Sequence, residues 1–364
     1  MTERKINVLV AEDSTVTRLF LVHLLESDPQ ICVIGAVGDG QAALDFFKEN
    51  KPDVVLMDIH MPRMDGFEAT RRIMETQPVP IVICSATARA RDVVITFQAM
   101  EAGAIACVEK PLGREHRDFE VMAAHLLQTV KLMSEVKVVR RTARSRPAPL
   151  PAVQPAAHPA QAAQWQRAAA EVKLIGIGAS TGGPPVLQTI LAGLPKDFPA
   201  PMLVVQHIAH GFLAGMAEWL NQTTGLQIQL ASYGATPLPG HVYLAPDDFH
   251  MGVSAGGAIV LTREEPENHL RPAVSFLFRS LAEAYGPNAL GVLLTGMGKD
   301  GAAELKLMRD KGAITIAQDR ESSVVHGMPG EAIALGGATQ VLPADKIAAA
   351  LVALVNHRNG ILRN

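Results

Sequence analysis

The sequence predicts two α/β domains, each built around a mostly parallel sheet. Short runs of Val, Ile and Leu alternate with segments of helical periodicity in both halves of the chain. Such continuous apolar runs are typical of strands that helices cover on both faces. A stretch rich in Pro, Ala and Gln lies between the halves and has too few large aliphatic residues to build a core. We therefore expect domains at residues 1–133 and 172–364, joined by a linker at residues 134–171.

The composition restricts the classes of protein to which the chain could belong. Its 364 residues suffice for two domains, and 48% of them are hydrophobic, so each half can bury a core. A formal net charge of −3 gives no broad positive field for nucleic acid or membrane. No apolar run reaches the ~18 residues of a membrane span, and the sequence starts without a signal-peptide pattern. We therefore expect a cytoplasmic protein with no nucleic-acid partner and no direct membrane insertion.

Two smaller features concern the cysteines and the linker. The cysteines Cys32, Cys84 and Cys107 are few, odd in number and not arranged as C-x-x-C, which favours a reducing compartment. A basic cluster in the predicted linker is open to two interpretations, a solvated segment or a docking patch. Its members are Lys137, Arg140, Arg141, Arg144 and Arg146.

The first half predicts a doubly wound, flavodoxin-like domain. Its expected strands are the apolar runs at residues 6–10, 31–37, 54–57, 80–84 and 105–108. Helical periodicity fills the gaps between them, for example at residues 17–26 and 66–75. Five such units fit a five-stranded parallel sheet whose functional edge lies at the carboxyl ends of the strands.

Polar residues follow the ends of these predicted strands. Glu12 and Asp13 follow the first strand and Asp58 ends the third, while Ser85 ends the fourth and Lys110 follows the fifth. Any one of these residues alone could be a helix or turn cap, but all five share one register at the same edge. Clustered carboxylates repel each other unless a cation neutralises them. A hard divalent ion such as Mg²⁺, which prefers oxygen ligands, would do so and would also offset the charge of an incoming phosphoryl group.

The stretch Asp58-Ile-His-Met-Pro-Arg-Met-Asp-Gly66 resembles the receiver domain of two-component response regulators. The resemblance covers residues 5–133 and implies that Asp58 accepts phosphate from a histidine kinase. It implies further roles for residues in this pocket: Mg²⁺ ligands at Glu12, Asp13, Asp58 and the backbone carbonyl of His60, and switch residues at Ser85 and Lys110, with a cis peptide bond before Pro111. Cys107 occupies the position where receivers usually carry an aromatic switch residue, so the relay of phosphorylation stays open.

The second half predicts a mostly parallel α/β domain with a small antiparallel insertion. Its expected strands lie at residues 174–178, 202–206, 241–245, 258–261, 290–295 and 313–317. Its expected helices lie at residues 185–192, 211–222, 273–284, 302–311 and 345–355. Between residues 227 and 262 the runs are short and broken by Gly and Pro, which favours an antiparallel insertion there.

The glycine-rich turn that follows residue 174 has two competing interpretations. Gly176, Gly178 and Gly182 resemble the turn of a dinucleotide-binding unit. That interpretation expects an acidic residue at the end of the next strand, but this strand ends in Gln206 and His207. No tyrosine in this half has a lysine four residues later, so the short-chain dehydrogenase pair is missing as well. The nicotinamide oxidoreductase interpretation is therefore disfavoured.

The other interpretation makes Ser180 a nucleophile. A hydroxyl between a strand and a helix N-terminus is exposed, and backbone N–H groups point at it. A serine needs a base that a carboxylate orients, and His207 and Asp300 each follow a different strand at the same edge. His210 is a rival base, and Asp247 and Asp248 are rival orienting residues.

A metal site in this half is not expected. His250 and His269 could suggest one, but neither H-E-x-x-H nor C-x-x-C spacing is present.

A set of motifs in residues 171–354 resembles the catalytic domain of chemotaxis protein-glutamate methylesterases. The motifs are Gly178-Ala-Ser-Thr-Gly-Gly183, Gln206-His207, Pro239-Gly-His-Val-Tyr-Leu-Ala-Pro246, Thr295-Gly-Met-Gly-Lys-Asp-Gly301 and Gly327-Met-Pro329. The resemblance implies hydrolysis of glutamate methyl esters on methyl-accepting chemoreceptors, and deamidation of receptor glutamines. It implies that Ser180 is the nucleophile, His207 the base and Asp300 its orienter, and that the N–H groups of Thr181 and Met297 form the oxyanion hole. Ala209 departs from the proline that relatives tend to carry.

Together the two resemblances predict a receiver that governs a serine hydrolase by phosphorylation. Two alternatives from other classes stay open to test. One is a non-catalytic module that competes for a kinase; the intact Ser, His and Asp set argues against it. The other is a response regulator acting on DNA, but the second half has no compact basic recognition helix.

Overall fold

The structure is a computed structural model and describes residues 4–356 apart from 86–89, 112, 114, 117, 118, 137 and 139–170. The chain divides into two units, and each is considered by itself. The predicted linker with its basic cluster lies almost wholly outside the described residues, and the predicted domain bounds stay predictions. Within the described ranges no helix is both long enough and apolar enough to span a membrane.

The first unit contains the five-stranded parallel sheet that the sequence predicts. Its strand order is β2-β1-β3-β4-β5, the order of a doubly wound domain with a switch point between β1 and β3. The strands are β1 (Ile6–Ala11), β2 (Ile31–Val37), β3 (Val54–Met57), β4 (Ile81–Ser85) and β5 (Ala106–Glu109). β3 and β4 are buried along their whole length because helices cover both faces of the sheet.

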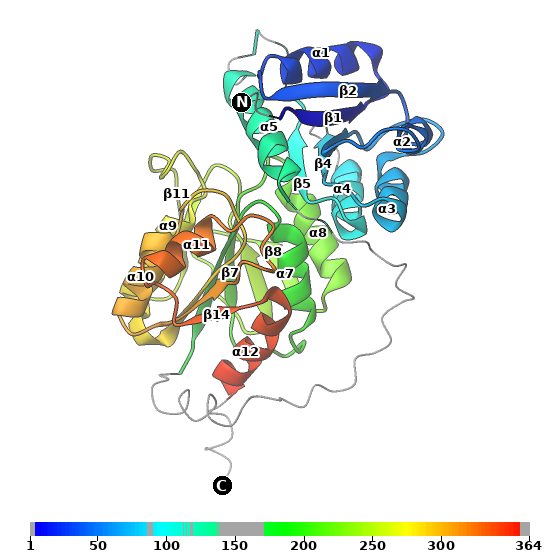
Figure 1. Cartoon of the computed structure of the whole chain (residues 1–364). Helices are drawn as coiled ribbons and strands as arrows, with labels where there is room; N and C mark the ends of the chain where they lie inside the picture. The colour runs from blue at the N-terminus through cyan, green and yellow to red at the C-terminus, as the bar shows by residue number, and fades with distance from the viewer. Residues whose placement is uncertain are drawn as a thin grey trace. The chain divides into compact units, whose positions relative to one another are not determined.

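Helices cover the two faces of this sheet in two groups (Figure 1). Helices α1 (Thr15–Glu26) and α5 (Phe119–Ser134) share one face, where the rings of Phe20 and Phe119 lie 6.2 Å apart. Helices α2 (Gly40–Phe46), α3 (Gly66–Thr76) and α4 (Ala90–Ala102) pack in sequence on the other face. Side chains at the N-caps Ser14, Asp39 and Asp65 accept hydrogen bonds from the first turns of α1, α2 and α3.

The second unit has a seven-stranded sheet in the order β14-β13-β12-β6-β7-β9-β8, and every pairing in it is parallel. The strands are β6 (Leu174–Ala179), β7 (Met202–Gln206), β8 (Gln227–Leu230), β9 (His241–Leu244), β12 (Ala289–Leu293), β13 (Ile314–Gln318) and β14 (Gln340–Leu342). The first strand of this unit, β6, is flanked by β7 on one side and β12 on the other, so the chain reverses its winding direction there. Ligand sites in open α/β sheets lie at such switch points.

Helices again form two groups, on either side of this sheet (Figure 1). One group contains α9 (Val274–Ala284), α10 (Ala302–Asp310) and α11 (Met328–Ala334), which pack in sequence. In the other group α7 (Gly183–Ala192) packs against α12 (Ala344–Asn356), and α8 (Leu213–Thr223) follows β7. A one-turn 3₁₀ helix, η1 (Gly286–Asn288), leads into β12.

The antiparallel insertion is present but smaller than the sequence predicts. Among the strands of the described ranges, only β10 (His250–Val253) and β11 (Ile259–Thr262) pair antiparallel, in a sheet of their own. β8 and β9, which fall in the same stretch of sequence, join the main sheet in parallel. The Gly- and Pro-rich breaks that surround them mark turns between parallel strands, not hairpins.

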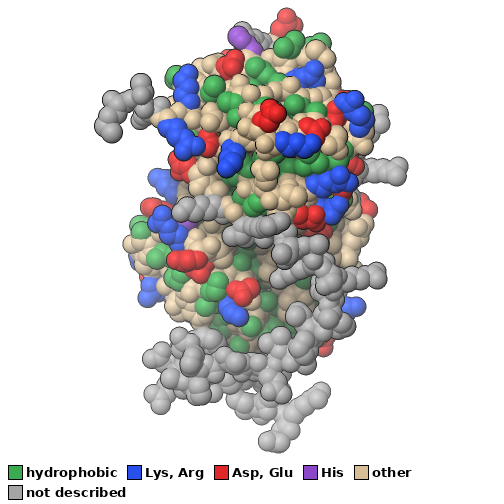
Figure 2. Space-filling model, turned by 45° about the vertical axis from the view of Figure 1, so that its right-hand side comes forward, with side chains coloured by type: hydrophobic (Ala, Val, Ile, Leu, Met, Phe, Trp, Pro, Cys, Tyr) green, Lys and Arg blue, Asp and Glu red, His purple; other side chains and the backbone are tan. Residues whose placement is uncertain are grey.

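The surface carries both signs of charge. On the face shown in Figure 2, Lys and Arg side chains are interspersed with Asp and Glu, and no area of one sign dominates. This face therefore offers no broad positive field of the kind that nucleic acid requires.

Candidate functional site

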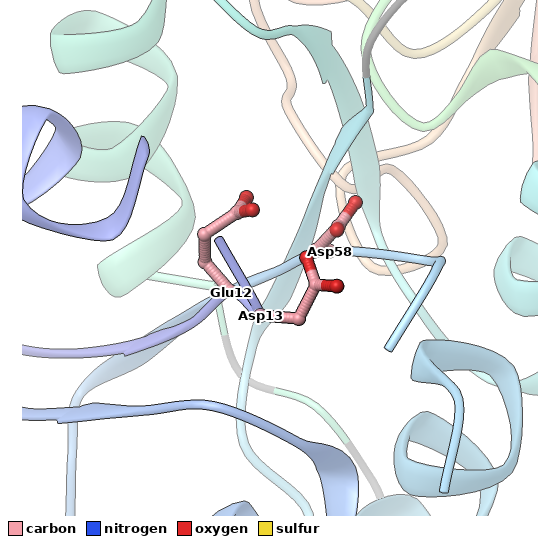
Figure 3. A group of neighbouring side chains, drawn as sticks. All are labelled: Glu12, Asp13 and Asp58. Carbon is pink, nitrogen blue, oxygen red and sulfur yellow. The ribbon is translucent and has the colours of Figure 1, made fainter. Parts of the chain in front are cut away.

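Three carboxylates meet at the carboxyl edge of the first sheet (Figure 3). Glu12 and Asp13 follow β1 and Asp58 follows β3, and one oxygen of each lies within 4.8 Å of the others. Glu12 and Asp58 are buried, whereas Asp13 is exposed to solvent. An all-oxygen group of this charge and spacing matches the ligand preference of a hard divalent cation.

Lys110 completes this pocket. Its Nζ lies 2.7 Å from Glu12 Oε2 and 2.9 Å from Asp58 Oδ1. Burial by itself lowers the pKa of Lys110, but the carboxylates of Asp58 and Glu12 outweigh burial and raise that pKa. Burial and the neighbouring Asp58 raise the pKa of Glu12 against the opposing effect of Lys110. The carboxylates of this pocket therefore repel each other, and a bound cation would reduce that repulsion.

The backbone around Asp58 is fixed on both sides. The Asp58 N–H donates to the carbonyl of Ala11 at 2.8 Å, and the Ile59 N–H donates to Asp58 Oδ1 at 2.8 Å. A Cβ on Gly66 would lie 2.0 Å from the Asp58 carbonyl oxygen, so only glycine fits at that position. Ser85 is buried at the end of β4, where its carbonyl accepts from the Lys110 N–H at 3.0 Å. The expected residues thus share one edge.

Two details of this unit bear on the resemblance. The only cis peptide bond within the described ranges joins Arg271 to Pro272, so the expected cis bond before Pro111 is not found. Burial raises the pKa of the Cys107 thiol, which keeps it neutral at the position of the usual aromatic switch.

The second unit brings Ser180 and His207 to adjacent strand ends. Ala179 and Gln206 are register partners in β6 and β7, and Ser180 and His207 are the residues that follow them. The His207 N–H donates to the Ala179 carbonyl at 2.9 Å, which extends the ladder by one bond. On the other side of β6, the Ser180 N–H donates to the carbonyl of Thr295, which lies just beyond β12, at 3.0 Å.

Asp300 lies against His207. Its Oδ2 is 3.0 Å from His207 Nε2, and the carboxylate is 2% exposed. The same carboxylate accepts the Val274 N–H at 2.6 Å and the Ser275 hydroxyl at 2.6 Å. It therefore caps the first turn of α9, where the backbone N–H groups and the helix dipole favour negative charge.

These contacts determine the ionisation of Asp300. Burial by itself raises the pKa of a carboxyl group, but the close contact with His207 and the hydrogen bonds from Ser275 and the Val274 N–H outweigh burial and lower the pKa of Asp300. Asp300 is therefore an anion that can orient the imidazole through Nε2. That contact leaves Nδ1 of His207 as the nitrogen for proton transfer.

The turn that carries Ser180 leads directly into α7. The Gly183 N–H donates to the Ser180 carbonyl at 2.8 Å, and Gly182 has a φ of 78°, a conformation that favours glycine. Within the described ranges, no protein group accepts a hydrogen bond from the N–H of Thr181 or Met297. Both N–H groups are thus available to an oxygen of a bound molecule.

Gly296 allows the third strand end to approach the nucleophile. A Cβ on Gly296 would lie 2.7 Å from Ser180 Cβ and 2.4 Å from the sulfur of Met328. The backbone of the segment between β12 and α10 therefore lies in close contact with Ser180. This close approach brings Met297 and Asp300 to the same edge as Ser180 and His207.

His250, which the sequence could suggest as a metal ligand, has another role. His250 is fully buried, accepts from the Ala273 N–H at 3.2 Å through Nδ1, and uses Nε2 toward the Glu265 carbonyl at 3.1 Å. Both of its ring nitrogens are thus committed to the backbone. The carboxylate found against His207 is that of Asp300, where Asp247 and Asp248 were rivals.

Two family models match the chain, one in each half. The family model for the response regulator receiver domain matches residues 8–117, and that for the CheB methylesterase matches residues 175–351. A Nitrosospira multiformis protein named protein-glutamate methylesterase/protein-glutamine glutaminase is 54% identical over 97% of this chain and 98% of its own length. A Geobacter metallireducens protein of the same name is 54% identical over 96% of this chain and 99% of its own length. The chain belongs to the CheB methylesterase family.

A solved CheB structure agrees with the second unit. The methylesterase catalytic domain of Thermotoga maritima CheB matches 51% of this chain and 100% of its own length, with 43% identity and a TM-score of 0.50. The sheet topology of the first unit and this match for the second confirm the expected fold. The individual roles of the site residues stay predictions.

Sequence reasoning gave no supporting role to several residues that hold the site without carrying its chemistry. These are Gln206, Ser275 and Thr295, all buried and polar. The Thr295 hydroxyl donates to the Thr181 carbonyl at 2.9 Å and accepts from the Val325 N–H at 3.0 Å. A buried hydroxyl or amide at the end of an apolar run was the available signal, because such groups need partners.

Proposed function

We propose that this chain hydrolyses glutamate methyl esters, and deamidates glutamines, on methyl-accepting chemoreceptors under control of Asp58 phosphorylation. The names of its relatives and the two matched family models support both halves of this proposal. The observation that carries it is the contact of 3.0 Å between His207 Nε2 and the buried Asp300, beside the strand end that bears Ser180. This is the constellation of a serine hydrolase.

The first step is attack by Ser180 Oγ on the carbonyl carbon of the ester. His207 Nδ1 accepts the serine proton, while its Nε2–H stays with the Asp300 carboxylate. No hydrogen bond joins Ser180 Oγ to His207 within the described ranges. In free enzymes such bonds are often long and tighten when substrate binds.

The tetrahedral oxyanion is stabilised by the N–H groups of Thr181 and Met297. Each such donor contributes about 3–4 kcal/mol in other hydrolases. Methanol then leaves with the proton held by His207. Water attacks the resulting acyl-serine while His207 accepts its proton, and His207 then returns that proton to Ser180 Oγ as glutamate is released. Deamidation follows the same path, with ammonia as the leaving group.

In the receiver, Asp58 is the phosphoacceptor and a chemotaxis-type histidine kinase is the donor. Glu12, Asp13, Asp58 and the His60 carbonyl would hold Mg²⁺, which when bound neutralises charge on the transferring phosphoryl group. Lys110 already pairs with Asp58 at 2.9 Å and is placed to pair with the phosphoryl oxygens. Ser85, at the end of the adjacent strand, supplies a hydroxyl to the same group. Phosphorylation raises hydrolytic turnover.

Release of methanol from methylated chemoreceptor membranes tests the hydrolase. We expect release by the parent chain and at least a 10³-fold lower rate for Ser180→Ala. A Ser254→Ala variant is the control, because Ser254 lies in the β10–β11 turn and not at a strand end of the main sheet. Near-normal release by Ser180→Ala would exclude the nucleophile. No release by the parent chain would favour the non-catalytic kinase-binding module.

The regulatory half is tested with a small acyl phosphate and Mg²⁺ as phosphodonor. The parent chain should incorporate phosphate and release methanol faster, whereas Asp58→Asn should do neither and keep its unstimulated rate. Equal stimulation of the two proteins would contradict control through Asp58. Chelation of Mg²⁺ should abolish phosphate incorporation and leave unstimulated hydrolysis unchanged.

A further inference from the structure

The side chain of Gln206 joins the main chains of the nucleophile and the base. Its Nε2 donates to the Ser180 carbonyl at 2.8 Å and to the His207 carbonyl at 2.7 Å. The side chain is buried, and both N–H bonds of the amide are used within the site. A reversed amide would direct Oε1 at two carbonyl oxygens, so the chemistry of the partners fixes its orientation.

The Gln206 amide lies where the backbone hydrogen bonds between β6 and β7 end. The ladder between β6 and β7 ends at Ala179 and Gln206, with one more bond from the His207 N–H. Beyond it the chain after Ser180 enters α7, and the chain after His207 leads to α8. The Gln206 amide spans this divergence and replaces the ladder bond that the strands no longer supply.

Two further observations show that the site accommodates this amide at a cost to stability. Gln206 Oε1 is buried and has no hydrogen-bond partner within the described ranges, which is unfavourable for folding. A Cβ at Gly183 would lie 2.1 Å from that oxygen, so the first residue of α7 leaves room for the amide by being glycine. Because the unpaired oxygen lowers stability, stability alone does not explain why a glutamine lies here. The two hydrogen bonds that its amide donates explain it better.

We propose that Gln206 is a positioning residue that sets the separation and orientation of Ser180 and His207. The inference rests on the proposed function. Without the two donated bonds, the turns that carry Ser180 and His207 can move independently. Proton transfer between them requires close alignment, and a misplacement of about 1 Å can lower a rate about 100-fold. The Gln206 amide takes no part in substrate binding, so removal of its two hydrogen bonds should lower kcat and leave KM nearly unchanged.

The test compares Gln206→Met with the parent chain in methanol release from methylated chemoreceptor membranes. Methionine keeps the length and volume of the side chain and removes both donors. We expect kcat to fall about 10- to 100-fold, with KM within about twofold of the parent value. Assays are run well below the melting temperature of every variant.

Asn221→Leu is the matched control. The Asn221 amide also bridges two carbonyls, those of Ala217 at 3.0 Å and Ile228 at 2.6 Å. It lies where α8 approaches the start of β8, at the opposite edge of the sheet from the carboxyl ends. Asn221→Leu should lower the melting temperature and leave kcat unchanged. If both variants lowered kcat equally, loss of packing and not positioning would explain the effect, and the inference would be wrong.

Gly183→Ala is a second variant in case Gln206→Met does not fold. It keeps the amide but displaces it, and it should give the same fall in kcat at unchanged KM. Parent kcat in either folded variant would overturn the inference while leaving the hydrolase intact. If the parent chain released no methanol although its receptor membranes were methylated, the proposed function would fail, and this inference would fail with it.

Discussion

Ser275 is the residue whose replacement most directly tests how Asp300 is held. Its hydroxyl donates to Asp300 Oδ1 at 2.6 Å and accepts from the Gly301 N–H at 3.0 Å, all within buried surroundings. Ser275→Ala removes a hydrogen bond to a charged group, worth about 1.5–3 kcal/mol, and leaves a buried N–H unpaired, which costs about 1–3 kcal/mol. The expected loss of stability is therefore about 2.5–6 kcal/mol, or roughly 5–24 °C in melting temperature.

The same change should alter activity and its pH dependence. Asp300 keeps its backbone donors but loses the shorter of the two hydrogen bonds from Ser275 to Oδ1, so the imidazole of His207 is oriented less well and kcat should fall about tenfold, or ~1.4 kcal/mol. The lost donor stabilised the anion, so the folded pKa of Asp300 rises toward its ordinary value. Asp300 stabilises the fold above its unfolded pKa, and this contribution disappears as pH falls through its folded pKa. In the variant the disappearance should occur at higher pH.

Ser280→Ala on the same helix is the control for both measurements. The Ser280 hydroxyl accepts from the Val253 N–H at 3.1 Å and donates to the Leu277 carbonyl at 2.8 Å, and both partners are neutral. Its removal should cost about 0.5–1.5 kcal/mol per bond without changing kcat. Thermal melting across acidic pH and methanol release measure the two effects. If Ser275→Ala matched Ser280→Ala in melting, kcat and acid sensitivity, the argument for a held carboxylate would be refuted.

Two other substitutions test separate features of the chain. Gly296→Ala should lower kcat for methanol release at least tenfold, because the new Cβ would lie 2.7 Å from Ser180 Cβ. Gly256→Ala, whose Cβ would meet nothing closer than 3.8 Å, should match the parent, and equal rates for both variants would disprove the close approach. Glu68→Gln should cost less than about 1 kcal/mol at neutral pH, since exposed ion pairs are weak. Arg71 and Arg72 lower the Glu68 pKa to about 2, so that stability should vanish as pH falls from about 4.5 toward 2 in urea titrations.

The sequence was sufficient where apolar runs are continuous. β3, β4 and β7 are buried at every position, and the sequence singles out Asp58 and His207, which follow β3 and β7, and Ser85, which ends β4. The edge strands β8 and β14 were not predicted, because Gln227–Leu230 buries only one side chain and Gln340–Leu342 has three residues. α11 was missed as well, since seven residues that include Pro and Gly show no helical period.

The candidate site divides in the same way. Ser180, His207 and Asp300 could be proposed because each follows a predicted strand. The contacts that hold them could not, because Ser275 and Asp300 are 25 residues apart and meet only once α9 packs beside β12. The path of the chain beyond each strand decides which carbonyls a buried amide such as that of Gln206 can bridge. That path is set by packing and not by any local pattern.

Because Asp300 caps the first turn of α9, the active site stays intact only while that turn of the helix is formed. The carboxylate that orients His207 also satisfies the N–H groups of Val274 and Ser275. If the first turn of α9 opens, it releases the carboxylate, and the imidazole loses its orientation in the same event. Slow amide hydrogen exchange at Val274 should therefore be a direct readout of a competent site. Gradual heating should cause loss of hydrolysis and loss of that protection in a single transition.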